Sequence, residues 1–198
     1  MFYATDGPHG LPFNPIKAIV APRPIGWISS LSAAGVANLA PYSYFNAVHD
    51  APPMVMFSST GWKDTIANVE ATGEFVCNYV SASMRDAMNA SSGPVPTGTS
   101  EFDVAGLERE PSRGVAVPRV KGVVAALECR ALSITPLRGL DGRAVGGHLV
   151  VGQVTGVFID DDYIRDGRFD AGAADPIMRM GYMDYGALGA MFEMQRPG

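Results

Sequence analysis

Alternating apolar and polar positions, rich in β-branched and aromatic residues, predict a chain built mainly from strands. The predicted strands cover residues 16–32, 36–48, 52–60, 74–80, 123–137 and 146–160. Helical spacing is confined to residues 62–73 and 83–92, and Gly73 is expected to end the first helix. Because consecutive strands are expected to be neighbours, the pattern favours an antiparallel barrel with a few short helices over a doubly wound parallel sheet.

Prolines refine the first part of this pattern. Pro22 and Pro24 restrict their part of the first strand to an edge or a strand start, because proline cannot donate a ladder hydrogen bond. Gly35 supplies a turn, so the first two strands are expected to form a hairpin. Pro41 lies inside the second strand and predicts an edge or a bulge, where backbone groups stay free to face a ligand.

Two segments lack a regular period. Residues 92–120 are rich in Pro, Gly, Ser and Thr and predict a long excursion with one helical turn, which is expected to shape access to a ligand. Residues 175–192 are rich in Met and aromatic residues without a clean pattern. The sequence contains no internal repeat, so we expect one domain over residues 1–198 with a core at about 16–185.

Composition excludes several classes of protein. The 198 residues are 47% hydrophobic and 18% charged, as in a folded protein with a sizeable core. The net charge of −5 argues against nucleic-acid binding, which needs clustered Lys and Arg. The apolar runs are far shorter than the roughly 20 residues of a membrane span, and residues 1–13 lack the regions of a signal peptide. The expected location is the cytoplasm.

The two cysteines fit the same reducing compartment. Cys77 and Cys129 lie in apolar runs without CxxC spacing and without a nearby His, so no metal site is expected. We interpret both as small buried hydrophobic side chains.

A candidate phosphate site follows the third predicted strand. The run FSSTGWKDT places the hydroxyls of Ser58, Ser59 and Thr60, the charge of Lys63 and a helix start together, which suits a phosphate. Asp64 is better explained as a helix cap or an Arg partner. An ordinary capped helix has the same residue types and is the competing interpretation. The dinucleotide pattern GxGxxG and the Walker A pattern are both absent.

A candidate ligand wall lies in the second predicted strand. Strict alternation would send Tyr42, Tyr44 and Asn46 to one face, and Ser43 and Phe45 to the other. Aromatic rings with a hydroxyl and an amide can hold a flat ligand, although the same rings could simply belong to the core.

The third candidate is His148, which opens a predicted strand after two glycines. Backbone can approach a ligand closely there. A lone His is more often structural, and no Ser-His-Asp set or paired carboxylates accompany it.

Seven blocks in a fixed order resemble a known family. They are APRPIGWISS, NLAPYSYFNAVHDAPP, KDTIANVEATGEFVCN, EFDVAGLE, VKGVVAALEC, GGHLVVGQV and RMGYMDY. Together they resemble the flavin reductase-like family of FMN-binding split β-barrels, which includes flavoredoxins and flavin reductase components of two-component monooxygenases. The resemblance implies a mainly β, antiparallel split barrel of Greek-key type.

The resemblance also implies a homodimer with one FMN per subunit near the dimer interface. Residues 43–46 would line the ribityl chain and the isoalloxazine, largely through backbone groups. Ser59, Lys63 and Thr65 would form the phosphate site, with Asp64 beside it, and Arg23 and Trp27 would lie on the cofactor side or at the interface. His148 would lie near the flavin or the incoming nicotinamide. The implied cofactor-binding residues are Arg23, Trp27, Ser43, Tyr44, Phe45, Asn46, Ser58, Ser59, Lys63, Asp64 and Thr65.

The implied reaction is hydride transfer from NADH or NADPH to FMN, with electrons passing on to free flavin, a partner monooxygenase, oxygen or another redox protein. FMN would carry this chemistry, and no general acid or base is expected from the protein. Two alternatives stay open: an FMN-binding electron carrier that does not use NAD(P)H, and a structural barrel without flavin.

Overall fold

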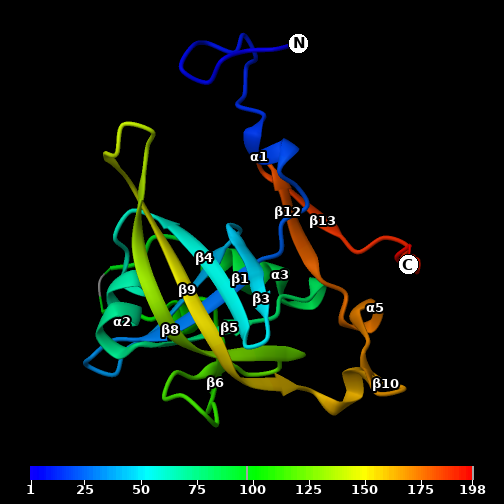
Figure 1. The fold of residues 1–198 in the computed structure, drawn as a ribbon. Coiled ribbons are helices and arrows are strands. Elements are labelled where there is room, and N and C mark those ends of the chain that lie inside the picture. Colours follow the sequence, from blue (N-terminus) through cyan, green and yellow to red (C-terminus); the bar gives the residue numbers. More distant parts are fainter. Residues whose placement is uncertain (97, 198) are drawn as a thin grey trace.

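Seven strands form one antiparallel sheet in the computed structural model, which describes residues 1–96 and 98–197 (Figure 1). The strands are β1 (Gly26–Leu31), β2 (Ala37–Tyr42), β3 (Phe45–Asp50), β4 (Pro53–Thr60), β5 (Glu74–Asn78), β8 (Ala125–Arg138) and β9 (Ala144–Ile159). Their order across the sheet is β2-β1-β5-β8-β9-β4-β3.

The two edge strands of this sheet, β2 and β3, are joined by only Ser43 and Tyr44. Because this short link keeps the two edges close together, the sheet must curl, and it forms an antiparallel split β-barrel. We call the gap between β2 and β3, which are not hydrogen-bonded to each other, the slit of the barrel. Pro41 lies in the edge strand β2, as its position in the sequence predicted. The slit of the barrel therefore lies at residues 41–44.

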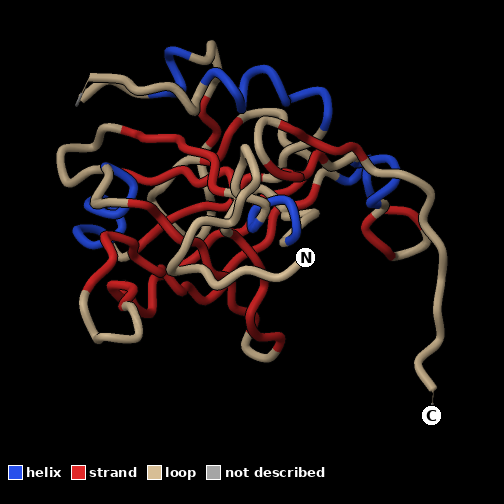
Figure 2. The backbone as a smooth tube through the Cα atoms, turned by 90° about the horizontal axis from the view of Figure 1, so that it is seen from above, coloured by secondary structure: helices blue, strands red, loops and turns tan. Residues whose placement is uncertain are grey.

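Shorter elements decorate the barrel. The helices are α1 (Ile16–Ile19), α2 (Asp64–Thr72), α3 (Arg85–Ala90), α4 (Glu101–Val104) and α5 (Ala171–Ala174), with 3₁₀ turns η1 (Ala82–Met84) and η2 (Asp161–Tyr163). Two-stranded ribbons are formed by β6 (Arg109–Glu110) with β7 (Arg119–Val120), β10 (Ile164–Arg165) with β11 (Arg168–Phe169), and β12 (Ile177–Gly181) with β13 (Asp184–Ala187). The C-terminal residues lead away from the barrel (Figure 2).

Two cores lie on opposite faces of the sheet, because alternate residues of β1 and β5 point to opposite sides. Trp27 and Val76 enter the core that packs under residues 82–123. Ile28, Phe75 and Cys77 enter the barrel interior, which also contains Cys129. Both cysteines are buried and unpaired, as expected.

Helix α2 closes one end of the barrel interior. Ile66 and Val69 are fully buried there, at the helical spacing that the sequence showed. Gly73 ends the helix with a left-handed φ of 72°, and its N–H donates to the carbonyl of Val69. The predicted helix and its end at Gly73 are confirmed.

Two sequence-based predictions were wrong in detail, and one segment for which no element was predicted forms a hairpin. Residues 16–19 form α1 rather than strand; the Asn14 side chain accepts the Ile16 N–H there, and β1 begins only after the prolines. The predicted strand 36–48 breaks at Ser43, so strict alternation across it fails. Residues 175–192, which showed no period, contain the hairpin β12–β13.

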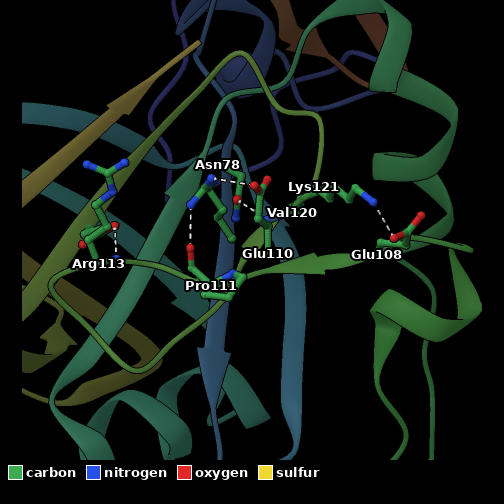
Figure 3. Close-up of polar contacts among 9 residues, drawn as sticks. Asn78, Glu108, Glu110, Pro111, Arg113, Val120 and Lys121 are labelled. Atoms are coloured by element: carbon green, nitrogen blue, oxygen red, sulfur yellow. Dashed lines mark hydrogen bonds and ion pairs between the residues drawn. The ribbon is translucent and has the colours of Figure 1, made fainter.

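The excursion at residues 92–120 contains one short helix, α4, as predicted, and also the ribbon β6–β7. Figure 3 shows how it is fastened to the sheet. The Asn78 side chain accepts the Val120 N–H at 2.8 Å, and Lys121 pairs with Glu108 at 2.7 Å. Helix α4 is joined to the edge strand β2 by two other contacts, in which Glu101 accepts the Leu39 N–H and the Ser100 hydroxyl donates to the carbonyl of Ala37.

Candidate functional site

A cleft of about 580 Å³ opens at the slit of the barrel. Its volume lies within the range of about 300–1,000 Å³ that is typical of small-molecule sites. The wall combines the edge strand β2, the 43–44 link, the end of β4, the start of α2, α4 and the loop after α3. The lining residues are Asn38, Ala40, Pro41, Tyr42, Ser43, Tyr44, Ser58, Thr60, Lys63, Asp64, Thr65, Ser91, Ser92, Gly93, Pro94, Val95 and Glu101.

The polar end of the cleft is the turn between β4 and α2. Ser58, Thr60, Lys63 and Thr65 all line it, so the structure brings together most of the candidate phosphate site. The first N–H groups of a helix have no intrahelical partner and, like Lys63, favour an anion. Ser59 differs, because its hydroxyl is buried and donates to the carbonyl of Gly61 at 3.1 Å.

Asp64 lies at the start of α2 and is exposed. The prediction that it caps the helix or pairs with an Arg was wrong: within the described residues its carboxylate has no hydrogen bond or ion pair, and no side chain caps the helix at Lys63. The Asp64 carboxylate therefore lowers the positive potential that Lys63 and the helix start create.

The 43–46 segment does not act as one wall. Tyr44 lines the cleft with a half-exposed ring, and the cationic groups of Lys17 and Arg23 lie 6.0 and 5.9 Å from its centroid. Phe45 turns the other way, where its ring fills the space beside Gly26. Asn46 is exposed on β3, and its side chain accepts the N–H of Ala47.

Arg23 and Trp27 lie behind the cleft rather than in it. The Arg23 guanidinium is buried and donates to the carbonyls of Lys17 and Val20. Trp27 is completely buried, and its indole N–H donates to the Ser91 hydroxyl at 2.9 Å. Trp27 therefore positions the Ser91 loop, and its side chain cannot contact a ligand in the cleft.

His148 lies on β9 opposite Ser59 of β4, outside the cleft lining. Its ring packs edge-on against Trp62, with centroids 5.0 Å apart. The Nδ1 atom is buried and has no hydrogen-bond partner within the described residues. His148 therefore lies beside the strand end that leads into the turn between β4 and α2, and its ring orientation is set by Trp62.

The sequence placed Tyr42 in the candidate ligand wall, but it indicated no role for Asn38 or Glu101. The Tyr42 hydroxyl is buried at the cleft without a hydrogen-bond partner among the described residues, although the hydroxyls of Thr65 and Ser59 are near enough to lower its pKa. Burial dominates and raises the Tyr42 pKa. A buried, unpaired phenol aimed at a cleft favours a polar ligand.

Glu101 is a buried carboxyl at the base of the cleft. It accepts the Leu39 N–H at 3.0 Å from the edge strand. Its pKa is raised, first by burial and further by the charge of Asp64, while the Leu39 N–H opposes this shift. Only the fold brings Glu101 to β2; the residue opens the block EFDVAGLE, but no local pattern indicated that it belongs to the site.

These features define a class: an antiparallel split barrel with a cleft at its slit whose lining suits a small anionic ligand. Comparison with known proteins gives the family. Residues 20–173 match the flavin reductase like domain, and the chain belongs to this family of FMN-binding split barrels.

Individual relatives agree with this assignment. An uncharacterized protein of Halalkalibacterium halodurans is 36% identical over 183 residues, covering 90% of this chain and 87% of the relative. Component B of nitrilotriacetate monooxygenase from Bacillus cereus is 30% identical with a TM-score of 0.85, covering 95% of this chain and 100% of that one. A Shewanella frigidimarina protein with a split barrel domain has a TM-score of 0.87 over the full length of both chains; at 20% identity it supports the fold alone.

Two features are absent from the residues that the structure describes. These residues contain no cluster of three or more His, Cys, Asp or Glu side chains able to hold a metal ion. None of the helices in this part of the chain has the length and apolar character needed to cross a bilayer.

Proposed function

We propose that this protein is an FMN-binding oxidoreductase that uses NADH or NADPH to reduce flavin and passes the electrons to an acceptor. The observation that carries the proposal is the slit cleft, where Lys63 and the unpaired Tyr42 hydroxyl face a common space, in a chain of the flavin reductase-like family. Both groups suit a ligand that combines an anionic end with a polar body.

The residues present fit FMN. Lys63, the hydroxyls of Ser58 and Thr65, and the first N–H groups of α2 would hold the phosphate. Tyr44 and the backbone of residues 43–46 would flank the ring system, since Tyr44 is half exposed beside the cleft. The Tyr42 hydroxyl would reach the chain that joins phosphate and ring.

Bound FMN would supply the hydride-accepting chemistry, which protein side chains lack. Lys63 would balance the phosphate charge, and backbone N–H groups of the 43–46 segment would stabilise negative charge near the ring. Trp62 and His148, whose rings pack edge-on against each other, would help to position the flavin or nicotinamide. No side chain needs to act as a general acid or base.

We also propose a homodimer that brings a second subunit close to the flavin. A second, largely apolar hollow of about 670 Å³ lies on the opposite side of the 43–46 segment, where Phe45 lines it together with Ile25, Leu127 and Val157. Val157 is 60% exposed there, which suits burial by another copy of the chain. The monooxygenase component relative makes a monooxygenase a candidate acceptor for the electrons.

The test is anaerobic mixing of the purified protein with NADH or NADPH, with and without added FMN, while flavin absorbance is followed. The proposal expects bleaching with at least one nucleotide. FMN binding without bleaching by either nucleotide would make the protein an electron carrier instead. A protein that neither contains nor binds FMN would refute the cofactor assignment.

A further inference from the structure

Three buried side chains, Glu101, Asn38 and Thr65, connect the base of the cleft to its polar end at the start of α2. The Asn38 side chain lies between Glu101 and Thr65, and these residues are 7%, 7% and 1% exposed. One terminal atom of the Asn38 amide is 3.1 and 3.2 Å from the two Glu101 carboxylate oxygens. The other is 2.9 Å from the Thr65 hydroxyl. The oxygen and nitrogen of an amide have nearly the same size, so the hydrogen bonds decide which of the two faces Glu101.

With Glu101 ionised, only one orientation satisfies the amide. A carboxylate can only accept, so Asn38 must turn its NH₂ group toward Glu101. Its oxygen then accepts from the Thr65 hydroxyl at 2.9 Å and from the Leu39 N–H at 3.1 Å. The Thr65 hydroxyl has a single proton, and in this orientation it donates that proton to Asn38. The Thr65 oxygen can then offer only lone pairs to a ligand, which disfavours a phosphate.

With Glu101 protonated, the Asn38–Glu101 and Asn38–Thr65 hydrogen bonds reverse direction, while the Leu39 N–H still donates to Glu101. The carboxyl O–H donates to the Asn38 oxygen, and the Asn38 NH₂ donates to the Thr65 oxygen. The Thr65 proton is then free to donate into the cleft. This state brings the amide nitrogen within 3.1 Å of the Leu39 nitrogen, so it needs an anion at Thr65 to favour it.

We infer that Asn38 and Glu101 are positioning residues that set the donor direction of Thr65, so that the cleft binds the FMN phosphate together with a proton on Glu101. The inference rests on the proposed function, because it places the phosphate at Thr65. It assigns Glu101 a role as the proton-dependent control of ligand affinity.

The surroundings of Glu101 favour a proton there. The charged and titratable groups that line the same cleft are Asp64, whose charge favours a proton on Glu101, Lys63, whose charge opposes it, and Tyr42 from β2. On α4 itself, Asp103 is paired with Arg109 at 2.8 Å. Residues 91–95 carry no charge. Burial and Asp64 raise the Glu101 pKa, and a bound phosphate dianion would raise it further.

Glu101→Gln tests this directly, because the introduced amide accepts from Leu39 and donates to Asn38, as the protonated carboxyl does. The Glu101→Gln variant should bind FMN about tenfold more tightly than the wild type does at pH 7.5, because the Thr65 hydroxyl gains a hydrogen bond to the charged phosphate. Riboflavin, which lacks the phosphate, should bind equally to both proteins. Fluorescence quenching measures both affinities.

Removing a negative charge would also tighten FMN binding, so a double-mutant cycle with Thr65→Val separates the two causes. The inference expects that Glu101→Gln gains nothing in the Thr65→Val background. A gain of equal size in both backgrounds would assign the effect to charge alone and overturn the inference.

Proton uptake gives a second readout that needs no activity. Calorimetry of FMN binding at pH 7 in buffers of different ionisation enthalpy should show more proton uptake by the wild type than by Glu101→Gln, with none in either for riboflavin. The titration of the phosphate, with a pKa near 6, is common to both proteins and cancels. Equal uptake would refute the inference while leaving the proposed function intact. Absence of FMN binding by the wild type would refute the proposed function itself.

Discussion

Lys63→Ala should weaken FMN binding about fivefold and leave riboflavin binding unchanged. Lys63 lies at the start of α2 on the cleft wall and is exposed, so water screens its charge. Exposed ion pairs contribute about 0.2–1 kcal/mol. A phosphate dianion increases this attraction, and the neighbouring Asp64 carboxylate offsets part of the gain. A net effect of about 1 kcal/mol corresponds to the fivefold change.

The assay is a fluorescence titration of each protein with FMN and with riboflavin at two salt concentrations. Salt shortens the screening length from about 10 Å at 0.1 M to about 3 Å at 1 M, so the difference between wild type and Lys63→Ala should shrink. Lys121→Ala is the matched control, because it removes the same charge from an exposed Lys that pairs with Glu108 away from the cleft. Lys63→Arg should retain most of the affinity.

Two results would refute this reasoning. Equal weakening of FMN and riboflavin by Lys63→Ala would show that Lys63 does not contact the phosphate. An equal loss in Lys121→Ala would show that only the net charge of the protein matters.

The remaining predictions concern stability and assembly. Ser91→Ala should lower the free energy of unfolding by about 1–3 kcal/mol, measured by urea denaturation, because it leaves the buried Trp27 N–H without its acceptor; an unchanged midpoint would contradict this. The raised Glu101 pKa means that the folded state binds this proton more tightly than the unfolded state, so the free energy of unfolding of the wild type should fall as pH rises from about 4.5 through the folded-state pKa. Glu101→Gln has no such proton and should become more stable relative to the wild type across that window. A constant difference in the free energy of unfolding from pH 4 to 8 would contradict this. Val157→Glu should convert a dimer to a monomer in sedimentation experiments, whereas Val145→Glu, at a similarly exposed site outside the apolar hollow, should not.

Much of the barrel could be predicted because its signals are local. Ile66, Val69 and Gly73 encode a helix and its end within a few residues, and Pro41 marks an edge strand because proline lacks a donor. Residues 16–19 were misread as strand, since a four-residue helix held by the Asn14 side chain leaves no hydrophobic period.

The site could be predicted only in part. The turn from Ser58 to Thr65 is contiguous, so its hydroxyls and Lys63 could be grouped from the sequence. The break at Ser43 could not, because it arises where the barrel closes and sends Tyr44 and Phe45 to different hollows. Glu101 reaches the cleft only because residues 92–120 fold back onto β2, which is a long-range contact without a local pattern.

The most direct test of the central claim is a crystal structure of the protein with FMN. The account predicts the phosphate between Lys63 and the first turn of α2, with the ring system beside Tyr44 at the slit of the barrel. FMN bound in the apolar hollow, or with its phosphate away from Lys63 and Thr65, would contradict it.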